Sequence, residues 1–394
     1  MKVLSIGAGT EQIHTIRLAR KLGFRTVAVD GNPSASGLAE ADIPIVQSID
    51  DEVALAAIAR QHEVCFVLPA PIGRFLTTVG YVNDTLGLPG ISRAAAAACV
   101  DKSRTHQILR AAGFPVADQV IAQHIGDVPA RFLSGSIVKP RFGSGSRGVR
   151  VCREAKDIEA ALVNCAAMPA EALVERLVEG EEFGIDGGSF GGRLKVFLIR
   201  QKVVTLDPYR VDMGYYVPAQ INETEYRAIE RTALHAAEAL GLTDCLFHAD
   251  VIVDHAGIPH IIEMSGRPSG MNISAKLVPL ATGLDPIAAA IGYLADKTAF
   301  PLVTDVKPSG LIYFSLPPGR IVSVGNIAAL ADWPGVIDVD CSLRVGECLH
   351  EPRSCGDFLR RGHALIQTAS IKTLRDLGDR VIEYVRKEIE IDRI

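Results

Sequence analysis

Two carboxylates stand at matching positions on two predicted strands in the second half of the chain. Apolar and polar residues alternate over 246–253, a turn follows at 254–257, and a second strand is expected over 258–264. Such a hairpin allows Asp250 and Glu263 to face one cleft. Paired oxygen ligands with open positions suit Mg²⁺, which keeps several waters and is usually completed by substrate phosphates. The pair therefore predicts a magnesium site, and the alternative is a surface hairpin with two solvated carboxylates.

Arg267 follows the second of these strands, inside a segment at 265–270 that is rich in Gly, Pro and Ser. Functional loops commonly lie at the ends of strands. A guanidinium held beside a metal-bound phosphate would neutralise the charge that develops during phosphoryl transfer. We therefore predict that Arg267 is catalytic.

A glycine-rich segment, VKPRFGSGSRGVRV at 138–151, begins and ends in strand-like sequence. Gly143, Gly145 and Gly148 match the pattern GxGxxG, but a strand follows them, where a dinucleotide-binding loop would open a helix. The backbone N–H groups of such a hairpin can close over an anion, and Lys139 adds a positive charge. These features predict a flap that covers phosphates, and a flexible surface hairpin is the alternative.

An apolar strand and turn at 172–182, ALVERLVEGEE, are suited to the base and sugar of a nucleotide. An adenine ring needs an apolar slot with a few backbone hydrogen bonds, and its ribose needs an acceptor such as Glu182. Taken alone, the segment is not specific for a nucleotide.

The composition is that of a globular protein of two or three domains, with 394 residues and a formal net charge of −5. Without a dense run of Lys and Arg, nucleic acid and anionic membranes are not the expected partners. The eight cysteines include no CxxC pair, which fits a reducing compartment. No apolar run approaches the ~20 residues that cross a bilayer, and the initial MKVLSIGAGT is typical of a strand and turn. We therefore expect a cytoplasmic protein.

Strand and helix signals alternate over the N-terminal part, which implies a parallel sheet covered by helices. There, Gly7 and Gly9 imitate a dinucleotide-binding turn, but Gln12 occupies the place of the third glycine. Farther along, Asn222 is expected to cap a helix, with Glu225 as its capping-box partner. The expected elements are strands at 2–6, 26–29 and 64–68, strand-rich hairpins at 137–151 and 173–198, and helices at 11–22, 51–61, 92–112, 154–166, 223–240 and 373–389.

Taken in order, these features resemble the ATP-grasp superfamily, and the resemblance covers essentially the whole chain. It implies an α/β and α+β chain with an ATP-grasp fold. Residues 1–100 would form an N-terminal Rossmann-like domain with a parallel sheet, 101–300 a central two-lobed nucleotide-binding domain, and 301–394 a small C-terminal α+β module. Within the central domain, the flap-bearing lobe would span about 115–180 and the metal-bearing lobe about 181–300.

The resemblance also implies a role for each matching residue. The nucleotide-binding residues would be Lys102, Lys139, Gly143, Ser144, Gly145, Gly148, Glu175 and Val178 at the adenine hinge, and Glu182 at the ribose. The metal ligands would be Asp250, Glu263 and Ser265, and the catalytic residues Arg267 and Lys139.

Two metal positions depart from the family pattern. The family usually has glutamate at the position of Asp250 and asparagine at the position of Ser265. A serine hydroxyl can still bind a metal ion or hold one of its waters. The sequence therefore leaves open whether one or two ions bind.

Within the superfamily, three features are most similar to the L-amino acid ligases. They are His248 two residues before a metal carboxylate, the MGYYVPAQ loop at 213–220, and the C-terminal module. The resemblance implies a ligase that uses ATP and Mg²⁺, for which Mn²⁺ can substitute, and that joins a carboxylate to an amine through an acyl phosphate. Its partners would be small-molecule substrates, and a homodimer is a candidate assembly.

Five residues near the predicted hairpins are candidates for the substrate pocket, and each is also compatible with an ordinary polar role. They are His248, Tyr215, Tyr216, Arg200 and Asp212. Two other functions remain as alternatives, a nucleotide-binding regulatory protein without turnover and an NAD-dependent oxidoreductase that uses Gly7 and Gly9. The oxidoreductase leaves the carboxylate pair unexplained.

Overall fold

The computed structural model describes residues 1–168 and 171–392. Its chain divides into two compact units, each assembled from separate segments. The predicted central domain is divided between these units, and the last two residues of the predicted C-terminal module lie outside the described part of the chain. The first unit comprises Met1–Val116, Gly184–Leu198 and Asn222–Thr304, and the second comprises Ala117–Phe183, Ile199–Ile221 and Asp305–Ile394.

The first unit begins with a parallel sheet in which β1 pairs with β2 and with β4. Most residues of β1 are buried, which is typical of a parallel strand that helices cover on both faces. The sheet contains, in spatial order, β3 (Ile43–Val46), β2 (Arg25–Asp30), β1 (Lys2–Ile6) and β4 (Val64–Val67). The helices of this region are α1 (Thr10–Lys21), η1 (Ser36–Glu40), α2 (Glu52–Gln61), α3 (Leu76–Leu86), α4 (Arg93–Val100) and α5 (Lys102–Ala111).

The single helix predicted at 92–112 is wrong, because the segment forms two helices, α4 and α5. Asp101 separates them in an extended conformation, with φ −96° and ψ 101°. Its carboxylate accepts hydrogen bonds from the backbone N–H groups of Ser103 and Arg104, at 3.1 and 3.3 Å. An aspartate that caps a new helix in this way competes with continuation of the previous one. The break makes Lys102 the first residue of α5, where it is buried.

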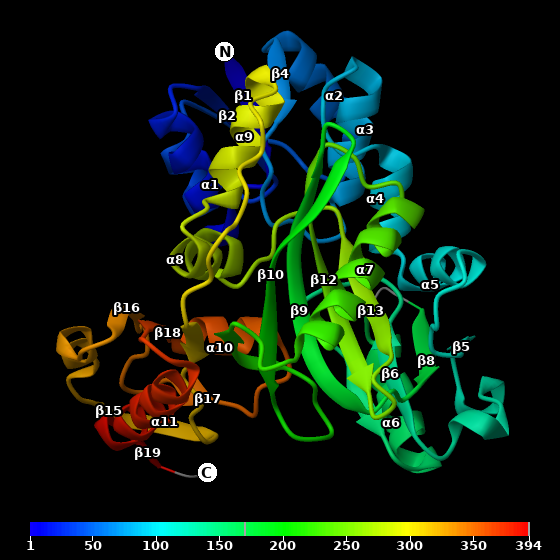
Figure 1. Ribbon diagram of the computed structural model, residues 1–394, viewed down its shortest axis with the longest axis vertical. Helices are drawn as coiled ribbons and strands as arrows, with labels where there is room; N and C mark the ends of the chain where they lie inside the picture. Colours follow the sequence, from blue (N-terminus) through cyan, green and yellow to red (C-terminus); the bar gives the residue numbers. More distant parts are fainter. Residues whose placement is uncertain (169–170, 393–394) are drawn as a thin grey trace. The chain divides into compact units, whose positions relative to one another are not determined.

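The predicted hairpin that carries the two carboxylates is confirmed, since β12 and β13 pair antiparallel. Next to β12 in the sheet lies β9, followed by β10, and both of these strands have residues in each unit. Figure 1 shows α9, drawn in yellow, beside α1 and β4 of the parallel sheet. The elements are β9 (Gly180–Phe190), β10 (Arg193–Val204), α7 (Glu223–Ala239), β12 (Cys245–Asp254), β13 (Pro259–Ser265), the π-helix η4 (Ile273–Leu277), α8 (Val278–Thr282) and α9 (Pro286–Asp296).

The second unit contains a four-stranded sheet that includes the glycine-rich hairpin. β6 and β7 pair antiparallel on either side of the glycines, which confirms the predicted hairpin. The buried face of α6, with Ile158 and Leu162, belongs to the core of this sheet. In spatial order the strands are β5 (Gln119–Ala122), β8 (Ala172–Arg176), β6 (Ser136–Pro140) and β7 (Arg150–Cys152), and the helices are η2 (Ile125–Asp127), η3 (Ala130–Phe132) and α6 (Ala155–Ala166).

The rest of the second unit consists of two further groups of strands and a long amphipathic helix, α11. In one group, β10 is followed in space by β11, β14, β18 and β16, and the other has the order β17-β15-β19. Leu374, Leu377, Val381 and Val385 are buried along one stripe of α11, at helical spacing. The elements are β11 (Asp212–Val217), β14 (Ser309–Tyr313), β15 (Gly319–Val324), η5 (Ile327–Asp332), β16 (Val336–Asp340), β17 (Cys348–Leu349), α10 (Cys355–Arg361), β18 (His363–Gln367), α11 (Ile371–Glu388) and β19 (Ile389–Asp392).

The loop predicted at 213–220 is wrong over most of its length, because β11 continues to Val217. This strand pairs with β10 on one side and with β14 on the other. Its tyrosines, Tyr215 and Tyr216, are both buried. Pairing on both edges and burial of the side chains outweigh the turn character that Gly and Pro give to this segment.

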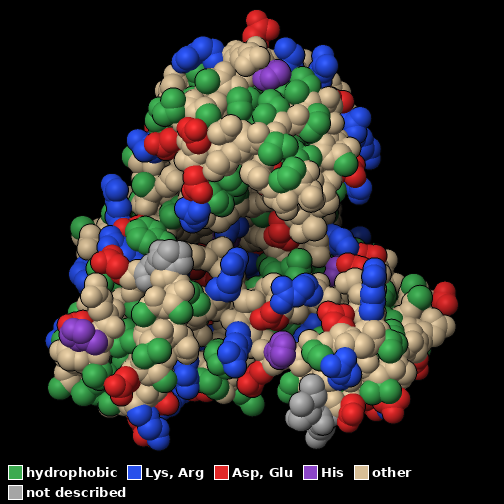
Figure 2. Space-filling model, turned by 180° about the vertical axis from the view of Figure 1, so that it is seen from behind, with side chains coloured by type: hydrophobic (Ala, Val, Ile, Leu, Met, Phe, Trp, Pro, Cys, Tyr) green, Lys and Arg blue, Asp and Glu red, His purple; other side chains and the backbone are tan. Residues whose placement is uncertain are grey.

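Side chains of both charges are mixed over the face drawn in Figure 2, as the small net charge of −5 leads one to expect. All eight cysteines are free thiols. Among the described residues, no single helix is long and apolar enough to cross a membrane, although a bent pair, Ile273–Thr282 and Pro286–Asp296, has such a length and composition when taken together.

The predicted capping box at the start of α7 is confirmed and generates a test of local stability. The side chain of Asn222 accepts a hydrogen bond from the N–H of Glu225 at 3.0 Å, and the Glu225 carboxylate accepts one from the N–H of Asn222 at 2.9 Å. We expect Asn222→Ala to lower the free energy of unfolding by about 1 kcal/mol, because an N–H of the first turn loses its partner. Denaturant titration measures the change, with Asn222→Ser as the control that keeps an acceptor. Equal midpoints for the alanine variant and the wild type would contradict the capping role.

Candidate active site

The hairpin of β12 and β13 places four polar side chains on one face. Its register sets Asp250 opposite Glu263 and His248 opposite Ser265. Residues directly opposite each other, and residues two apart on one strand, share a face of the sheet. Asp250 and Glu263 are half-buried, and Ser265 is buried. The structure therefore brings the three predicted metal ligands together, with His248 beside them.

This arrangement fits a hard divalent cation. Like charges directly opposite one another destabilise a sheet, and a cation between the two carboxylates would offset their repulsion. Within residues 1–168 and 171–392, no three His, Cys, Asp or Glu side chains form a metal-binding group. Two carboxylates and a hydroxyl supply only part of an octahedral shell, so waters and phosphate oxygens would complete the coordination of Mg²⁺.

Arg267 lies within the electrostatic reach of these carboxylates. Burial lowers the pKa of its guanidinium, and the charges of Glu263 and Glu11 oppose that effect. The backbone carbonyl of Arg267 lies 3.0 Å from Nδ1 of His248, which ties the loop after β13 to the hairpin. Because arginine stays protonated in proteins, its guanidinium supplies a fixed positive charge near the candidate metal ligands.

Glu11 is a candidate that the sequence reasoning missed. It lies in the first turn of α1, and Oε2 of its carboxylate accepts a hydrogen bond from the N–H of Met271 at 3.0 Å. Burial raises the pKa of Glu11, while the bond from Met271 and the charge of Arg267 oppose the rise. The available signal was an acidic residue two positions after the glycine turn that follows the first parallel strand, a common location for ligand sites.

The backbone that contacts Glu11 is itself unusual. Met271 and Asn272 have φ values of +57° and +58°, in the left-handed region that residues other than glycine rarely adopt. Two such residues in succession are held only where the surrounding structure over-determines them, and they cluster at functional sites. This supports the segment that follows Arg267 as part of the site.

In the second unit, Lys139 and Glu175 form a buried ion pair. Nζ of Lys139 lies 2.7 Å from Oε2 of Glu175, and their side chains are 4% and 3% exposed. The pair joins neighbouring strands, since Ile137 of β6 stands opposite Glu175 of β8. A buried charge is tolerated only when it is paired, so each of these residues holds the other in place.

The glycine loop between β6 and β7 needs its glycines for backbone reasons. Gly143, Gly145 and Gly148 have φ values of +138°, +70° and +74°, which side chains disfavour. The loop is anchored to the C-terminal part of the same unit, because the N–H of Cys355 donates to the carbonyl of Gly145 at 2.9 Å. Ser144, which lies between two of the glycines, is half-buried.

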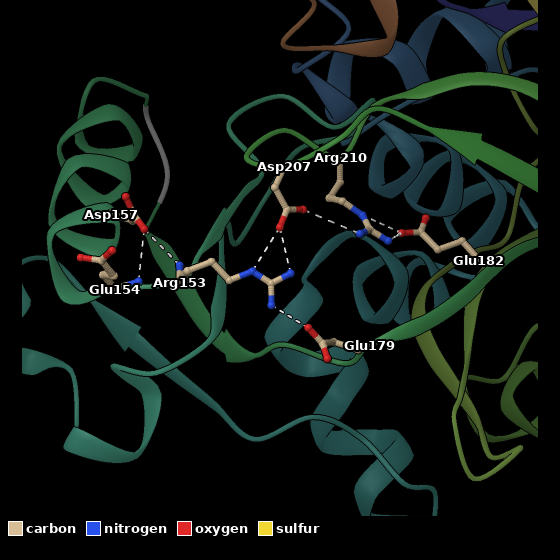
Figure 3. A network of polar contacts seen from close by, with 7 residues as sticks. All are labelled: Arg153, Glu154, Asp157, Glu179, Glu182, Asp207 and Arg210. Carbon is tan, nitrogen blue, oxygen red and sulfur yellow. Dashed lines mark hydrogen bonds and ion pairs between the residues drawn. The ribbon is translucent and has the colours of Figure 1, made fainter.

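The predicted ribose ligand Glu182 lies in a network of ion pairs. Nε of Arg210 donates to the Glu182 carboxylate at 2.9 Å, and Nζ of Lys202 lies 3.6 Å from Glu182 and 3.1 Å from Asp212. Figure 3 shows Arg210 reaching from Glu182 toward Asp207. Sequence reasoning missed Lys202 and Arg210. The pattern that could have identified them is two basic residues close to acidic residues on a predicted hairpin.

A second arginine extends this network next to β7. Arg153 pairs with Asp207 at 2.9 Å and with Glu179 at 2.6 Å (Figure 3). Glu179 directly follows Val178, the predicted hinge residue, which lies in the connection between β8 and β9. The contacts of Arg153 thereby tie the hinge segment to the strand that follows the glycine loop.

Three of the five candidate substrate residues, Arg200, Asp212 and Tyr215, lie close together in the second unit. The hydroxyl of Tyr215 donates to Asp212 at 2.7 Å, and the guanidinium of Arg200 lies 5.0 Å from the centre of the Tyr215 ring. Burial raises the pKa of Tyr215 well above its usual value. Tyr216 is the next residue along the strand and belongs to the apolar core with α11. His248 lies in the first unit, beside Ser265.

The predicted site residues are divided between the two units. The first unit carries Lys102, His248, Asp250, Glu263, Ser265 and Arg267, and the second carries Lys139, Gly143, Ser144, Gly145, Gly148, Glu175, Val178, Glu182, Arg200, Asp212, Tyr215 and Tyr216.

Residues 134–276, which include most of these positions, match the ATP-grasp domain family. The chain contains an ATP-grasp domain. A D-alanine–D-alanine ligase of Anaeromyxobacter dehalogenans is 28% identical over 257 residues, which are 61% of this chain and 80% of that protein. The predicted resemblance to the ATP-grasp superfamily is thereby confirmed.

Solved structures share the fold of the whole chain. An L-amino acid ligase from Bacillus licheniformis superposes with a TM-score of 0.83 at 21% identity, over 100% of this chain and 99% of that one. The biotin carboxylase domain of a 2-oxoglutarate carboxylase from Hydrogenobacter thermophilus, solved with MgADP, ADP and bicarbonate, has a TM-score of 0.72 at 17% identity, over 99% and 90%. The whole chain therefore shares its fold with a ligase and with a carboxylase domain that was solved with MgADP.

The buried pair in the ATP-grasp domain generates a prediction about stability without nucleotide. Glu175→Gln leaves the Lys139 ammonium buried without a counter-charge, so we expect a loss of about 3–5 kcal/mol in the free energy of unfolding. Adding Lys139→Met removes the orphan charge and should restore most of the loss. Glu171→Gln, which breaks the more exposed pair with Arg141, is the matched control and should change stability by less than about 1 kcal/mol. Equal losses for the two glutamate variants in denaturant titrations would refute the argument.

Proposed function

We propose that this chain is an ATP- and Mg²⁺-dependent ligase that joins the carboxylate of an amino acid to an amine and releases ADP and phosphate. The observation that carries the proposal is the opposition of Asp250 and Glu263 across one hairpin, followed by Arg267, inside an ATP-grasp domain. Two of the relatives are named as ligases of amino acids, which supports the substrate class.

The proposed reaction has two steps. A carboxylate oxygen of the acid attacks the γ-phosphorus of ATP, the bond to the β,γ-bridging oxygen breaks, and ADP leaves. The nitrogen of the amine then attacks the carbonyl carbon of the acyl phosphate. Phosphate leaves, the nitrogen loses a proton, and an amide remains.

In the first unit, the chain supplies the charges that this phosphoryl transfer needs. Asp250, Glu263 and Ser265 would hold Mg²⁺, with Mn²⁺ as a substitute, and the ion would neutralise charge on the transferring phosphoryl group. Arg267 stabilises the same group and then the acyl phosphate, because its guanidinium is fixed beside the metal ligands. Lys102 contributes a further positive charge to the phosphates.

In the second unit, the chain binds and covers the nucleotide. The ammonium of Lys139 has three donors, so it can serve both Glu175 and a phosphate oxygen. The backbone N–H groups of the glycine loop lie over the phosphates and exclude water, because an acyl phosphate open to solvent would be hydrolysed. Val178 contributes to the adenine slot, and the remaining lone pairs of Glu182 accept from the ribose hydroxyl groups.

The charges around Arg267 also suit an amino acid. Its guanidinium is complementary to a carboxylate, and the half-buried Glu11 nearby is complementary to an α-ammonium group. Both residues lie in the first unit. Together they would orient a zwitterion, which supports an amino acid as the acid that becomes phosphorylated.

The proposed enzyme works in the cytoplasm on small molecules. Its eight cysteines are free thiols, which fits a reducing compartment. A homodimer is the proposed assembly, and light scattering of the purified protein tests it.

An ADP-release screen of amino acids, singly and in pairs, tests the proposed function, with mass detection of the amide product. Calorimetry with Mg·ATP and with NAD⁺ accompanies it. Tight binding of NAD⁺ without a response to Mg·ATP would favour an oxidoreductase. Binding of Mg·ATP with no ADP formed from any pair would favour a regulatory protein without turnover.

Removal of either metal carboxylate should nearly abolish turnover. Glu263→Gln and Asp250→Asn keep the shape of each side chain and remove the charge that holds the ion, so we expect ADP formation to fall at least a hundredfold at moderate Mg²⁺. Asp254→Asn is the matched control on the same hairpin, because this carboxylate bonds the turn residues Ala256 and Ile258. Near-normal rates in the first two variants would show that the pair is an ordinary feature of a surface strand.

Ser265 provides a separate test of the metal site. If its hydroxyl binds the ion or one of its waters, Ser265→Ala should weaken Mg²⁺ binding by about 1 kcal/mol, the worth of one neutral interaction. Ser265→Asn should preserve the affinity or improve it, since an amide oxygen is also a good ligand. Activity is titrated against Mg²⁺ for the wild type and both variants. Three superimposable curves would remove Ser265 from the metal site.

A further inference from the structure

A cavity in the first unit borders Arg267 and lies largely outside the residues that the proposed function uses. Its volume is about 40 Å³. The loop after β4, helix α3, the start of β12 and helix α9 form its walls, and all of them belong to the first unit. The loop after β4 lies at the carboxyl end of a parallel strand, where open α/β sheets commonly bind their ligands.

The walls of this cavity are mostly apolar. Ile72, Leu76 and Val79 line one part, and Leu246 lines another. The charged side chains at the cavity are Arg267 and Asp244, and Asp244 forms an ion pair with Lys297 at 3.6 Å. An apolar space with one cationic group at its edge is typical of a site for a small molecule that has both an anionic and an apolar part.

Asn83 contributes a polar side chain to the lining of the cavity. It lines the cavity and is 2% exposed, and its Nδ2 donates to the carbonyl of Ile91 at 3.0 Å. Its Oδ1 is buried and has no hydrogen-bond partner among the residues that the structure describes. Because its Nδ2 is held by the carbonyl of Ile91, the Asn83 amide is fixed in the wall of the cavity.

The size of the cavity limits what can enter. One buried water needs roughly 10–15 Å³ of such space, so the cavity holds about three waters or an aliphatic side chain of similar extent. Side chains of the size of valine, leucine, isoleucine and methionine meet this limit. Glycine would leave the space to water, and an aromatic ring would exceed it.

We infer that the cavity receives the side chain of the substrate acid, and that this acid is an amino acid with an aliphatic side chain of three or four heavy atoms. The inference rests on the proposed function, in which Arg267 stabilises the acyl phosphate of that acid. A carboxyl group at Arg267 directs the neighbouring side chain along the apolar wall made by Ile72, Leu76 and Val79. These three residues thereby determine the specificity for the acid.

Hydroxylamine as the amine isolates the specificity for the acid from that for the natural amine. Its nitrogen attacks the carbonyl carbon of the acyl phosphate, phosphate leaves, and a hydroxamate forms that gives a coloured complex with ferric iron. The full-length wild type is assayed with ATP, Mg²⁺, hydroxylamine and a graded series of acids, from glycine and alanine through valine, leucine and methionine to phenylalanine. We expect kcat/KM to rise with side-chain size as far as leucine and methionine and to fall for phenylalanine.

Two variants change the cavity in opposite directions. Val79→Phe fills it, and the ratio of kcat/KM for leucine to that for alanine should fall about tenfold or more. Leu76→Ala enlarges it, and the ratio for phenylalanine to that for leucine should rise by a similar factor. Val53→Phe adds the same ring on α2 at a residue that is 65% exposed, and both ratios should stay at their wild-type values.

The hydroxamate rates and the kcat/KM ratios of the variants decide between support for the inference and its rejection. Equal rates of hydroxamate formation from all acids would overturn the inference and leave the proposed function intact. The same holds if the kcat/KM ratios of both cavity variants equal those of the wild type. If no acid gives hydroxamate, the proposed function fails, and calorimetry then tests the cavity with leucine and glycine in the presence of Mg²⁺ and a non-hydrolysable ATP analogue. Absence of leucine binding in that experiment would also overturn the inference, whereas tighter binding of leucine than of glycine would support it.

Discussion

The direct opposition of Asp250 and Glu263 across β12 and β13 is the constraint on which the rest of the candidate site depends. Side chains alternate between the two faces of a strand, so a slip of one residue in the pairing would move one carboxylate to the opposite face. The same register brings Ser265 and His248 to that face. It also sets where β13 ends, and therefore where the loop begins that carries Arg267 and contacts Glu11. The candidate metal ligands, the guanidinium of Arg267 and its neighbour Glu11 thus follow from one strand pairing.

In the second unit, ion pairs keep the charged side chains of the candidate nucleotide site in place. Lys139 and Glu175 neutralise each other in the core, and Glu182 is surrounded by Arg210 and Lys202. Such pairs add little net stability, but they hold side chains in defined positions before a ligand arrives. The glycine loop obtains its conformation from positive φ angles and an anchor at Cys355. Preorganised charge of this kind is what phosphoryl transfer requires, because there is little other chemistry for the protein to perform.

Local patterns were sufficient to predict several parts of the molecule. The alternation in β12 and β13 predicts both the hairpin and the facing carboxylates, because a period of two belongs to the strand itself. The capping box at Asn222 and the glycine hairpin before β7 are also local, since each depends on neighbours within a few residues. Two local expectations were wrong. Asp101 ends α4 by capping α5, and the segment with Tyr215 and Tyr216 is a strand because it pairs on both edges.

The sequence by itself therefore determined the ATP-grasp architecture, the carboxylate pair and the residues of the glycine loop. Only the tertiary structure decided that Glu11 meets the loop after Arg267, although 260 positions separate Glu11 from Met271. It likewise decided that Lys139 pairs with Glu175, that Tyr215 and Tyr216 belong to different environments, and that an apolar cavity borders Arg267. The reason is physical: spacing along the chain constrains contacts within one helix or hairpin, whereas contacts between distant segments depend on how the packed elements bury their side chains.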